Sequence, residues 1–168
     1  LIALDAKTGE RAWHYQLVHH DIWNYDTPTA PVLMDVDMNG RTVPMVAQVT
    51  KQNFLYVFNR ETGEPIWPIE EQPVPASLIP GEKLSDTQPF PTKPAPYDMQ
   101  GLTHDDLIDF TPELRQAAID NLKEYQIGPL FHPPLHRDND LGFKAAFWCP
   151  GDGGGANIDG PPVADPET

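Results

Sequence analysis

The sequence predicts an all-β fold, a partial β-propeller of about two blades with a Pro-rich, partly helical insertion. The main observation is a repeat: residues 3–13 (ALDAKTGERAW) return 54 positions later as residues 57–67 (VFNRETGEPIW). A third copy begins at residue 164 with ADPET. Repetition at such a period indicates stacked structural units, and periodic turn and aromatic motifs are typical of propeller blades.

Each copy of the repeat has the chemistry of a tight turn between two short strands. In the pattern Asp/Asn-x-x-Thr-Gly, the first side chain can bond backbone groups two residues on, and the Gly can adopt a positive φ. Hydrophobic runs precede both turns, and a Trp stands four positions after each Gly. We therefore expect two hairpins whose Trp packs against a neighbouring unit. Two unrelated hairpins that share a common turn are the alternative.

The first 70 residues are expected to be mostly β. A strand over residues 31–36 leads to an Asn39-Gly40 sequence, which is a strong signal for a hairpin turn. Further strands are expected at residues 42–49 and 54–58. These elements are assigned to propeller blades.

Residues 71–148 form the predicted insertion, called the Pro-rich segment below. Residues 71–100 are expected to be extended, with little regular structure. Two short helices should follow. The first begins at Thr103 with a capping-box pattern. The second has Thr111 as its cap and Pro112 at its first position, and it should run to about Tyr125.

The Pro-rich segment is expected to lie between blades or within one. It either covers a face of the propeller and shapes substrate access, or serves packing alone. Residues 149–168 are interpreted as the start of a further blade that is cut short. The chain is therefore expected to be a piece of a larger protein.

Composition excludes several classes of partner. The chain has a net charge of −14 and no Lys/Arg cluster, which argues against nucleic acid and against a polybasic membrane anchor. No apolar run approaches the roughly 20 residues that cross a bilayer as a helix. Cys149 is the single cysteine, so no internal disulfide can form.

Residues 13–26 (WHYQLVHHDIWNYD) concentrate imidazoles, carboxylates and aromatic rings. His19, His20, Asp21 and Asp26 are ligand types that suit a transition metal, although their spacing matches no structural zinc pattern. Acid–base chemistry or a polar cofactor site fits the run better, because carboxylates beside His within aromatic walls are where pKa values are tuned. A hydrogen-bonded network at a blade corner is the structural alternative.

The run from Trp13 to Pro28 resembles a segment of the pyrroloquinoline quinone (PQQ) dehydrogenases. The likeness is greatest to the branch that contains the membrane-bound quinoprotein glucose dehydrogenases. The repeated turn and Trp resemble that family's tryptophan-docking motif, which ties the blades of an eight-bladed propeller together. The sequences DFTPEL at residues 109–114 and IGPLF at residues 127–131 extend the likeness over most of the chain.

The resemblance implies oxidation of an aldose, a polyol or another alcohol with PQQ and Ca²⁺. It also implies transfer of electrons to a quinone acceptor and a periplasmic location, with possible membrane association through other parts of the protein. In the family, an Asp at the position of Asn24 is the catalytic base near the Ca²⁺. An amide cannot take that proton at neutral pH, but its oxygen can bind Ca²⁺. Asp21 and Asp26 are the candidates to replace the base.

Three further residues are assigned to cofactor binding through the resemblance. Lys51 matches a basic residue beside the quinone oxygens, where a cation stabilises developing negative charge. Asn157, after the glycine run at residues 151–155, resembles an Asn near the cofactor, and His20 belongs to the imidazole pair. An ordinary solvated Lys and a loose glycine turn are the structural alternatives. The alternative function is a non-catalytic propeller scaffold, which Asn24 favours.

Overall fold

The computed structural model describes residues 1–150 and 160–165. Asn157 and the last residues of the third repeat copy lie outside these ranges. Within the described residues there are seven strands, namely β1 (Ile2–Leu4), β2 (Arg11–His14), β3 (Val32–Met38), β4 (Arg41–Val49), β5 (Leu55–Asn59), β6 (Ile69–Pro73) and β7 (Thr87–Pro91). They form three antiparallel sheets, β1-β2, β3-β4-β5 and β6-β7. This arrangement, with little helix, confirms the predicted all-β class.

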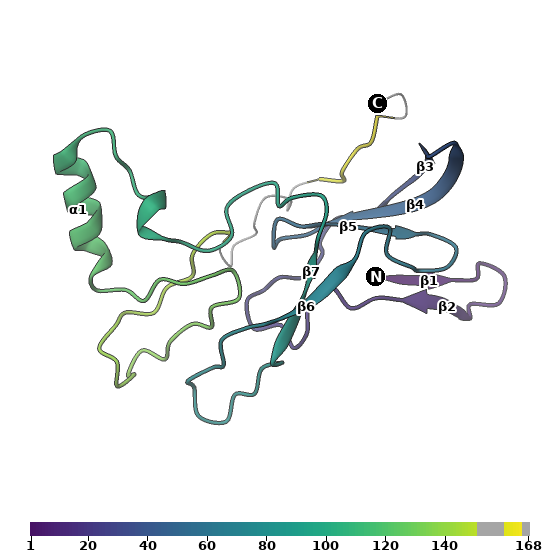
Figure 1. Ribbon diagram of the computed structural model, residues 1–168. Helices are drawn as coiled ribbons and strands as arrows, with labels where there is room; N and C mark the ends of the chain where they lie inside the picture. Colours follow the sequence, from purple (N-terminus) through teal and green to yellow (C-terminus); the bar gives the residue numbers. More distant parts are fainter. Residues whose placement is uncertain (151–159, 166–168) are drawn as a thin grey trace.

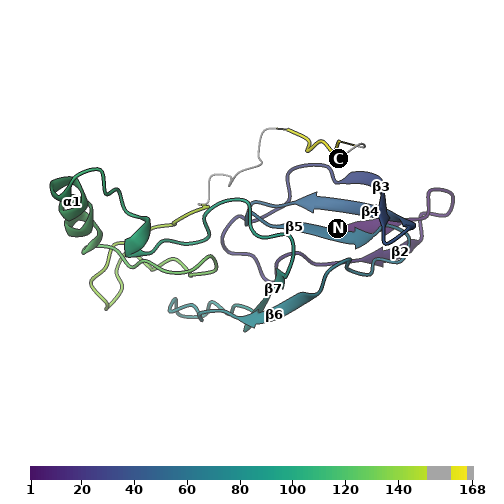
Figure 2. The ribbon, with the colours of Figure 1, turned by 45° about the horizontal axis from the view of Figure 1, so that its top comes forward.

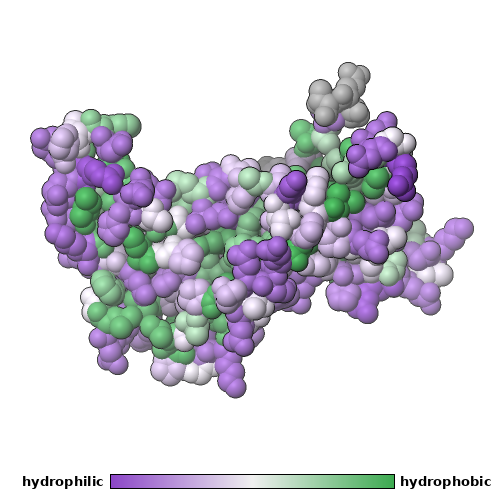
Figure 3. All heavy atoms as spheres, viewed as in Figure 1, coloured by the Kyte–Doolittle hydropathy of each residue, from purple (hydrophilic) through white to green (hydrophobic). Residues whose placement is uncertain are grey.

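The helical part is small and lies apart from the sheets. It consists of the 3₁₀ helix η1 (His104–Asp106) and the α-helix α1 (Pro112–Leu122). In both ribbon views α1 occupies one end of an elongated molecule, and strands β1 to β5 occupy the other (Figures 1 and 2). Polar side chains cover most of the face in Figure 3, and hydrophobic residues reach its surface below the α1 end. No helix among the described residues is both long and apolar enough to cross a membrane.

The predicted helix caps are present. Thr103 and Asp106 form the reciprocal capping box at η1, although the element is a single 3₁₀ turn. At α1, Thr111 Oγ1 accepts the backbone N–H of Leu114 at 3.3 Å. The helix ends at Leu122, before the predicted limit.

The two complete copies of the repeat fold in the same way. In the first, Asp5 Oδ1 accepts the N–H groups two and three residues on, at 2.9 and 2.8 Å. In the second, Asn59 Oδ1 accepts the corresponding groups at 2.9 and 3.2 Å. Gly9 and Gly63 then take φ values of 74° and 77°. The shared sequence therefore encodes one turn geometry through local hydrogen bonds.

Trp13 of the first copy packs on the turn of the second. Its Nε1 donates to the carbonyl oxygen of Arg60 at 2.9 Å. The ring lies so close to Gly63 that a Cβ there would come within 2.6 Å of it. The expectation that this Trp packs against a neighbouring unit is confirmed. In the second copy the returning chain makes only a single bridge, from Phe58 to Pro65, because proline cannot donate to a strand ladder.

Residues 71–100 contain extended backbone as expected, but the expectation missed a hairpin, because most of β6 and all of β7 lie there. The pairing joins Pro73 to Thr87, Glu71 to Pro89 and Ile69 to Pro91. Each strand of a two-stranded sheet is an edge, so prolines fit where their missing N–H group faces away from the partner. The prolines made this hairpin hard to predict from the sequence, but an edge strand can accommodate them.

The contact between Trp13 and Gly63 gives a matched pair of stability tests. We expect Gly63→Ala to lower the free energy of unfolding by about 2–4 kcal/mol. Alanine is strained at this positive φ, and its Cβ would clash with the Trp13 ring. Gly9→Ala should cost only about 1 kcal/mol, since the conformation is the same but the space is open. Denaturant titration of the full-length protein measures both. Equal losses would contradict the packing role of Trp13.

Candidate active site

The loop between β2 and β3 carries most of the predicted site residues. Asp21 folds this loop, because its two carboxylate oxygens accept the backbone N–H groups of Trp23 and Tyr25 at 2.8 and 2.7 Å. Asn24 lies between those two residues with a left-handed φ of 62°, and His20 has a φ of 47°. Asn tolerates this conformation better than most residues. Both Asn24 and His20 are exposed.

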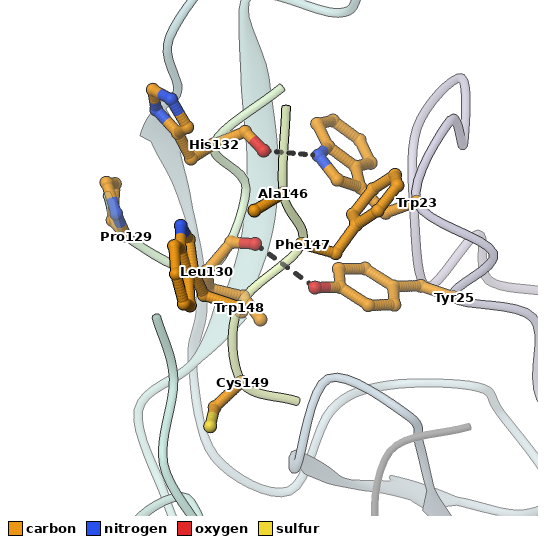
Figure 4. A pocket seen from close by; sticks show the side chains of 9 residues that line it. All are labelled: Trp23, Tyr25, Pro129, Leu130, His132, Ala146, Phe147, Trp148 and Cys149. Atoms are coloured by element: carbon orange, nitrogen blue, oxygen red, sulfur yellow. Dashed lines mark hydrogen bonds between the residues drawn. The ribbon is translucent and has the colours of Figure 1, made fainter. Parts of the chain in front are cut away.

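Burial alternates along the tip of the loop. Trp23 and Tyr25 are buried, whereas Asn24 and Asp26 are exposed. The indole of Trp23 donates to the carbonyl oxygen of His132 at 3.0 Å, and the hydroxyl of Tyr25 donates to that of Leu130 at 3.2 Å (Figure 4). The Pro-rich segment therefore holds the buried side of the loop, and the polar residues are left on the other side.

The hollow beside these anchors is too small for a cofactor. The side chains in Figure 4 enclose about 10 Å³, which is room for one water molecule. Aromatic packing accounts for the tightness, since the ring of Phe131 meets those of Trp23 and Tyr25 edge-on at centroid distances of 5.2 and 5.9 Å. This region is a structural joint between the loop and the Pro-rich segment.

His19 is attached to the β6-β7 hairpin. Its backbone N–H donates to Gln88 Oε1 at 2.8 Å, and Gln88 Nε2 donates back to the His19 carbonyl oxygen at 2.7 Å. The imidazole Nε2 lies 2.9 Å from Glu71 Oε1. Burial raises the pKa of Glu71, but hydrogen bonds from His19 and Thr87 outweigh it and hold that pKa below its ordinary value. His19 is thus engaged in fixing the loop to the hairpin.

Lys51 and Asp26 come together from separate elements. Lys51 lies in the turn between β4 and β5, and its Nζ is 2.5 Å from Asp26 Oδ1. The Lys51 side chain is only 6% exposed, whereas that of Asp26 is 59% exposed. Of the six lysines, all within the described residues, Lys51 is the one that is buried. An open hollow of about 290 Å³ borders Asp26.

This pair can perform two chemical tasks. A buried ammonium stabilises negative charge on a bound oxygen more strongly than an exposed one, because the surrounding dielectric constant is low. An exposed carboxylate can accept a proton from a hydroxyl group. The pair therefore combines a proton acceptor that borders a hollow with a buried cation behind it.

The residues considered for a transition metal do not converge on one point. His19 contacts Glu71, Asp21 accepts backbone N–H groups and Asp26 pairs with Lys51. Among residues 1–150 and 160–165, no three His, Cys, Asp or Glu side chains are grouped as metal ligands. Calcium binding by the Asn24 oxygen stays a prediction. So does cofactor binding by Asn157, which lies outside the described residues.

Sequence reasoning missed the residues that support the site. Gln88 fixes the backbone of His19, and Tyr97 and Gln100 bond the turn that carries Lys51. No local pattern marks these residues, because each acts on a partner far away in the chain. The prolines around them were the only signal, and they indicated extended backbone.

Comparison with known proteins identifies a family. The sequence model for the β-propeller domain of PQQ-linked glucose/ethanol/alcohol dehydrogenases matches residues 1–168. The quinate/shikimate dehydrogenase (quinone) of Acinetobacter baylyi is 37% identical over 158 residues, which are 94% of this chain and 19% of that protein. The quinoprotein glucose dehydrogenase of Escherichia coli is 41% identical over 110 residues, which are 61% of this chain and 14% of that protein.

A third relative has a different substrate in its name. The glycerol dehydrogenase large subunit of Gluconobacter oxydans is 38% identical over 114 residues, which are 67% of this chain and 15% of that subunit. The chain thus spans less than a fifth of the length of these curated relatives. No solved structure matches it.

The unequal exposure of Lys51 and Asp26 predicts unequal stability losses. Asp26→Asn should lower the free energy of unfolding by about 1–3 kcal/mol, because it leaves a buried ammonium without its countercharge. Lys51→Met should cost less than about 1 kcal/mol, since an apolar chain of similar volume fills the site and water solvates Asp26. Denaturant titration of both variants and of the double variant is the measurement. A double variant no more stable than Asp26→Asn alone would contradict this account.

The lowered pKa of Glu71 predicts a pH-dependent contribution to stability. Because its folded-state pKa lies below the ordinary 4.5, the carboxylate stabilises the fold above that pH, and this stabilisation disappears as the pH falls through the folded-state pKa. The stability difference between wild type and Glu71→Gln should therefore be largest at neutral pH and shrink in acid. Unfolding midpoints across pH, with the exposed neighbour Glu70→Gln as control, test this. A difference that is constant with pH would contradict it.

Proposed function

The chain belongs to the PQQ-dependent glucose/ethanol/alcohol dehydrogenase family and matches its β-propeller domain. We propose that the full-length protein oxidises an aldose, a polyol or another alcohol. In this proposal PQQ and Ca²⁺ are the cofactors, and the electrons pass to a quinone acceptor. We place the protein in the periplasm, with possible membrane association through other parts of it. The buried Lys51 ammonium beside Asp26 is the observation that carries the proposal.

The polar groups around Lys51 suit a ligand that is rich in oxygen atoms. Lys51 supplies a buried cation, and its neighbours Gln52 and Asn53 are buried amides. Both polar atoms of the Gln52 side chain, and Oδ1 of Asn53, have no hydrogen-bond partner. Buried polar atoms without partners are rare in native proteins and often belong to binding sites. When bound, PQQ supplies the redox chemistry that these side chains lack.

The proposed roles of four residues come from the family resemblance, and the chemistry of each side chain is consistent with its role. Lys51 donates to cofactor oxygens and stabilises the negative charge that gathers there on reduction. Asn24 offers its amide oxygen to Ca²⁺, which prefers oxygen ligands. His20 and Asn157 complete the proposed cofactor contacts. All of these roles are assigned through the family resemblance of the surrounding sequence.

Asp26 is a better candidate than Asp21 for the base that receives the substrate proton. Each oxygen of Asp21 already accepts a backbone N–H group, so taking a proton would disturb the loop. Asp26 is exposed, borders the hollow and faces a fixed ammonium. A proton can add to Asp26 Oδ2 while Oδ1 stays beside the Lys51 ammonium.

The proposal predicts the kinetics of three variants of the full-length protein, loaded with PQQ and Ca²⁺. Lys51→Met should lower turnover by about 10²-fold or more, because one preorganised charge contact with the reacting centre is lost. Asp26→Asn should lower turnover similarly if Asp26 is the base, whereas Asn24→Asp should raise it by restoring a carboxylate beside Ca²⁺. Dye reduction with glucose, glycerol and quinate measures the rates and the substrate class.

The controls separate catalysis from folding and from a scaffold role. Lys83→Met removes an exposed lysine and should leave turnover unchanged. Unchanged turnover in Lys51→Met would sink the assigned role of Lys51. A wild-type protein that binds PQQ without turnover would instead favour the non-catalytic scaffold. If the Asn24→Asp variant of such a protein then gained turnover, Asn24 would be the cause of the missing activity, and the scaffold function would again be favoured.

We also propose that residues 71–148 are an insertion between or within blades that supports this site. Its hydrogen bonds to the loop of Trp23 and to the turn of Lys51 support that assignment.

A further inference from the structure

The turn that carries Lys51 is unusual because it is buried. Thr50, Lys51, Gln52 and Asn53 connect β4 to β5, and none of them is more than 5% exposed. A buried turn must find partners for its backbone groups away from water. Two bonds are internal, from Thr50 N–H to the Phe54 carbonyl and from Asn53 N–H to the Thr50 carbonyl, each 3.0 Å long. Other partners must come from outside the hairpin.

Residues 97–100 of the Pro-rich segment, called the strap, provide those partners. The Tyr97 hydroxyl donates to the Thr50 carbonyl at 2.6 Å, and the Tyr97 N–H donates to the Asn53 carbonyl at 3.1 Å. Gln100 Nε2 donates to the Gln52 carbonyl at 2.6 Å. These bonds come from two strap residues and reach three carbonyl groups of the turn.

A further bond runs in the opposite direction. Asn53 Nδ2 donates to the Met99 carbonyl at 2.8 Å, and Asn53 itself has a left-handed φ of 65°. The strap thus bonds Thr50, Gln52 and Asn53, and these four bonds leave Lys51 to the ion pair with Asp26. The backbone of Lys51 is held on both sides while its side chain extends to a different partner.

Holding the backbone matters because a lysine side chain is long and flexible. Its four-carbon stem carries about 2 kcal/mol of rotamer entropy. A charge placed by such a stem reaches a reacting centre accurately only if its starting point is fixed, since catalytic groups need placement within about 0.5 Å. The strap fixes the Cα end of Lys51, and Asp26 fixes the ammonium end.

We propose that Tyr97 and Gln100 are positioning residues that set the Lys51 ammonium for the reaction proposed above, so their effect on turnover rests on that proposed function. They act through the turn and do not touch the reacting atoms. This gives the Pro-rich segment a direct role in the chemistry of the β4-β5 hairpin.

The Tyr97 hydroxyl can donate its hydrogen bond to the Thr50 carbonyl oxygen over a wide pH range. Partial burial is the main influence on its phenol and raises the pKa above the ordinary 10.0. The hydroxyl therefore keeps its proton throughout the neutral and mildly alkaline range, and the bond to the Thr50 carbonyl persists there.

The test is carried out on the full-length protein and has a readout that needs no cofactor. An amine-acylating reagent followed by peptide mass spectrometry reports the reactivity of each lysine. In wild type, Lys51 should react far more slowly than the exposed lysines. Tyr97→Phe and Gln100→Leu should each raise the acylation rate of Lys51 by about tenfold, because loss of one buried hydrogen bond loosens the turn by that factor. The other lysines should not change.

Kinetics with PQQ and Ca²⁺ provide the second readout. Tyr97→Phe should lower kcat by about tenfold and leave the substrate KM unchanged, since the cation and not the substrate pocket is displaced. In a Lys51→Met background, Tyr97→Phe should have no further effect on kcat. Tyr125→Phe, which removes a hydroxyl from a partly buried Tyr elsewhere in the Pro-rich segment, is the matched control and should match wild type in both readouts.

Each other outcome has a definite meaning. Unchanged Lys51 reactivity in both strap variants would overturn the proposal. A uniform rise at all lysines would also overturn it, because it would show general loosening of the fold. Selective exposure of Lys51 in a protein that shows no PQQ-dependent turnover would support the positioning of Lys51 and refute the proposed function. The two proposals can therefore fail separately.

Discussion

A continuous run of aromatic contacts connects the loop that carries Asp26 with the strand that follows the turn of Lys51. Nine rings follow one another at centroid distances of 4.9 to 6.5 Å, from Trp13 and Tyr15 through Phe58, Tyr56, Phe54, Phe90 and Phe131 to Tyr25 and Trp23. The run joins β2, β5, β7, the Pro-rich segment and the β2-β3 loop. Because protein interiors pack as densely as organic crystals, none of these parts can move without displacing its neighbours. The relative positions of Asp26 and Lys51 depend on this constraint.

The same constraint explains how a segment with little regular structure is ordered. Backbone carbonyls of the Pro-rich segment accept bonds from Trp23 and Tyr25, and its strap supplies bonds to the turn of Lys51. Polar groups that regular structure would satisfy internally are satisfied here by the loop and the turn. The segment and the site therefore stabilise each other. This coupling favours a supporting role for the segment over packing alone.

What the sequence could predict was local. The turns at Asp5 and Asn59 and the cap at Thr111 depend on hydrogen bonds between residues no more than three positions apart. Trp13 was predicted to pack against a neighbouring unit only because the repeat revealed that unit. The bonds of Tyr97 to Thr50, His19 to Gln88 and Trp23 to His132 span 47, 69 and 109 positions. Such contacts leave no local pattern, so neither the β6-β7 hairpin nor the strap could be found without the fold.

Among the described residues, most of the buried polar groups that lack partners lie in the turn of Lys51, and their free-energy cost is an argument that this turn is functional. Five buried side-chain atoms in the described part of the chain lack partners, and three of them belong to Gln52 and Asn53. The buried ammonium of Lys51 lies beside them, although burying a charge is among the most expensive features a fold can contain. A pure scaffold would be more stable with apolar residues in that turn. Retaining a cation and two amides there is understandable if the turn faces a ligand that completes their hydrogen bonds, which a quinone bearing several oxygens would do.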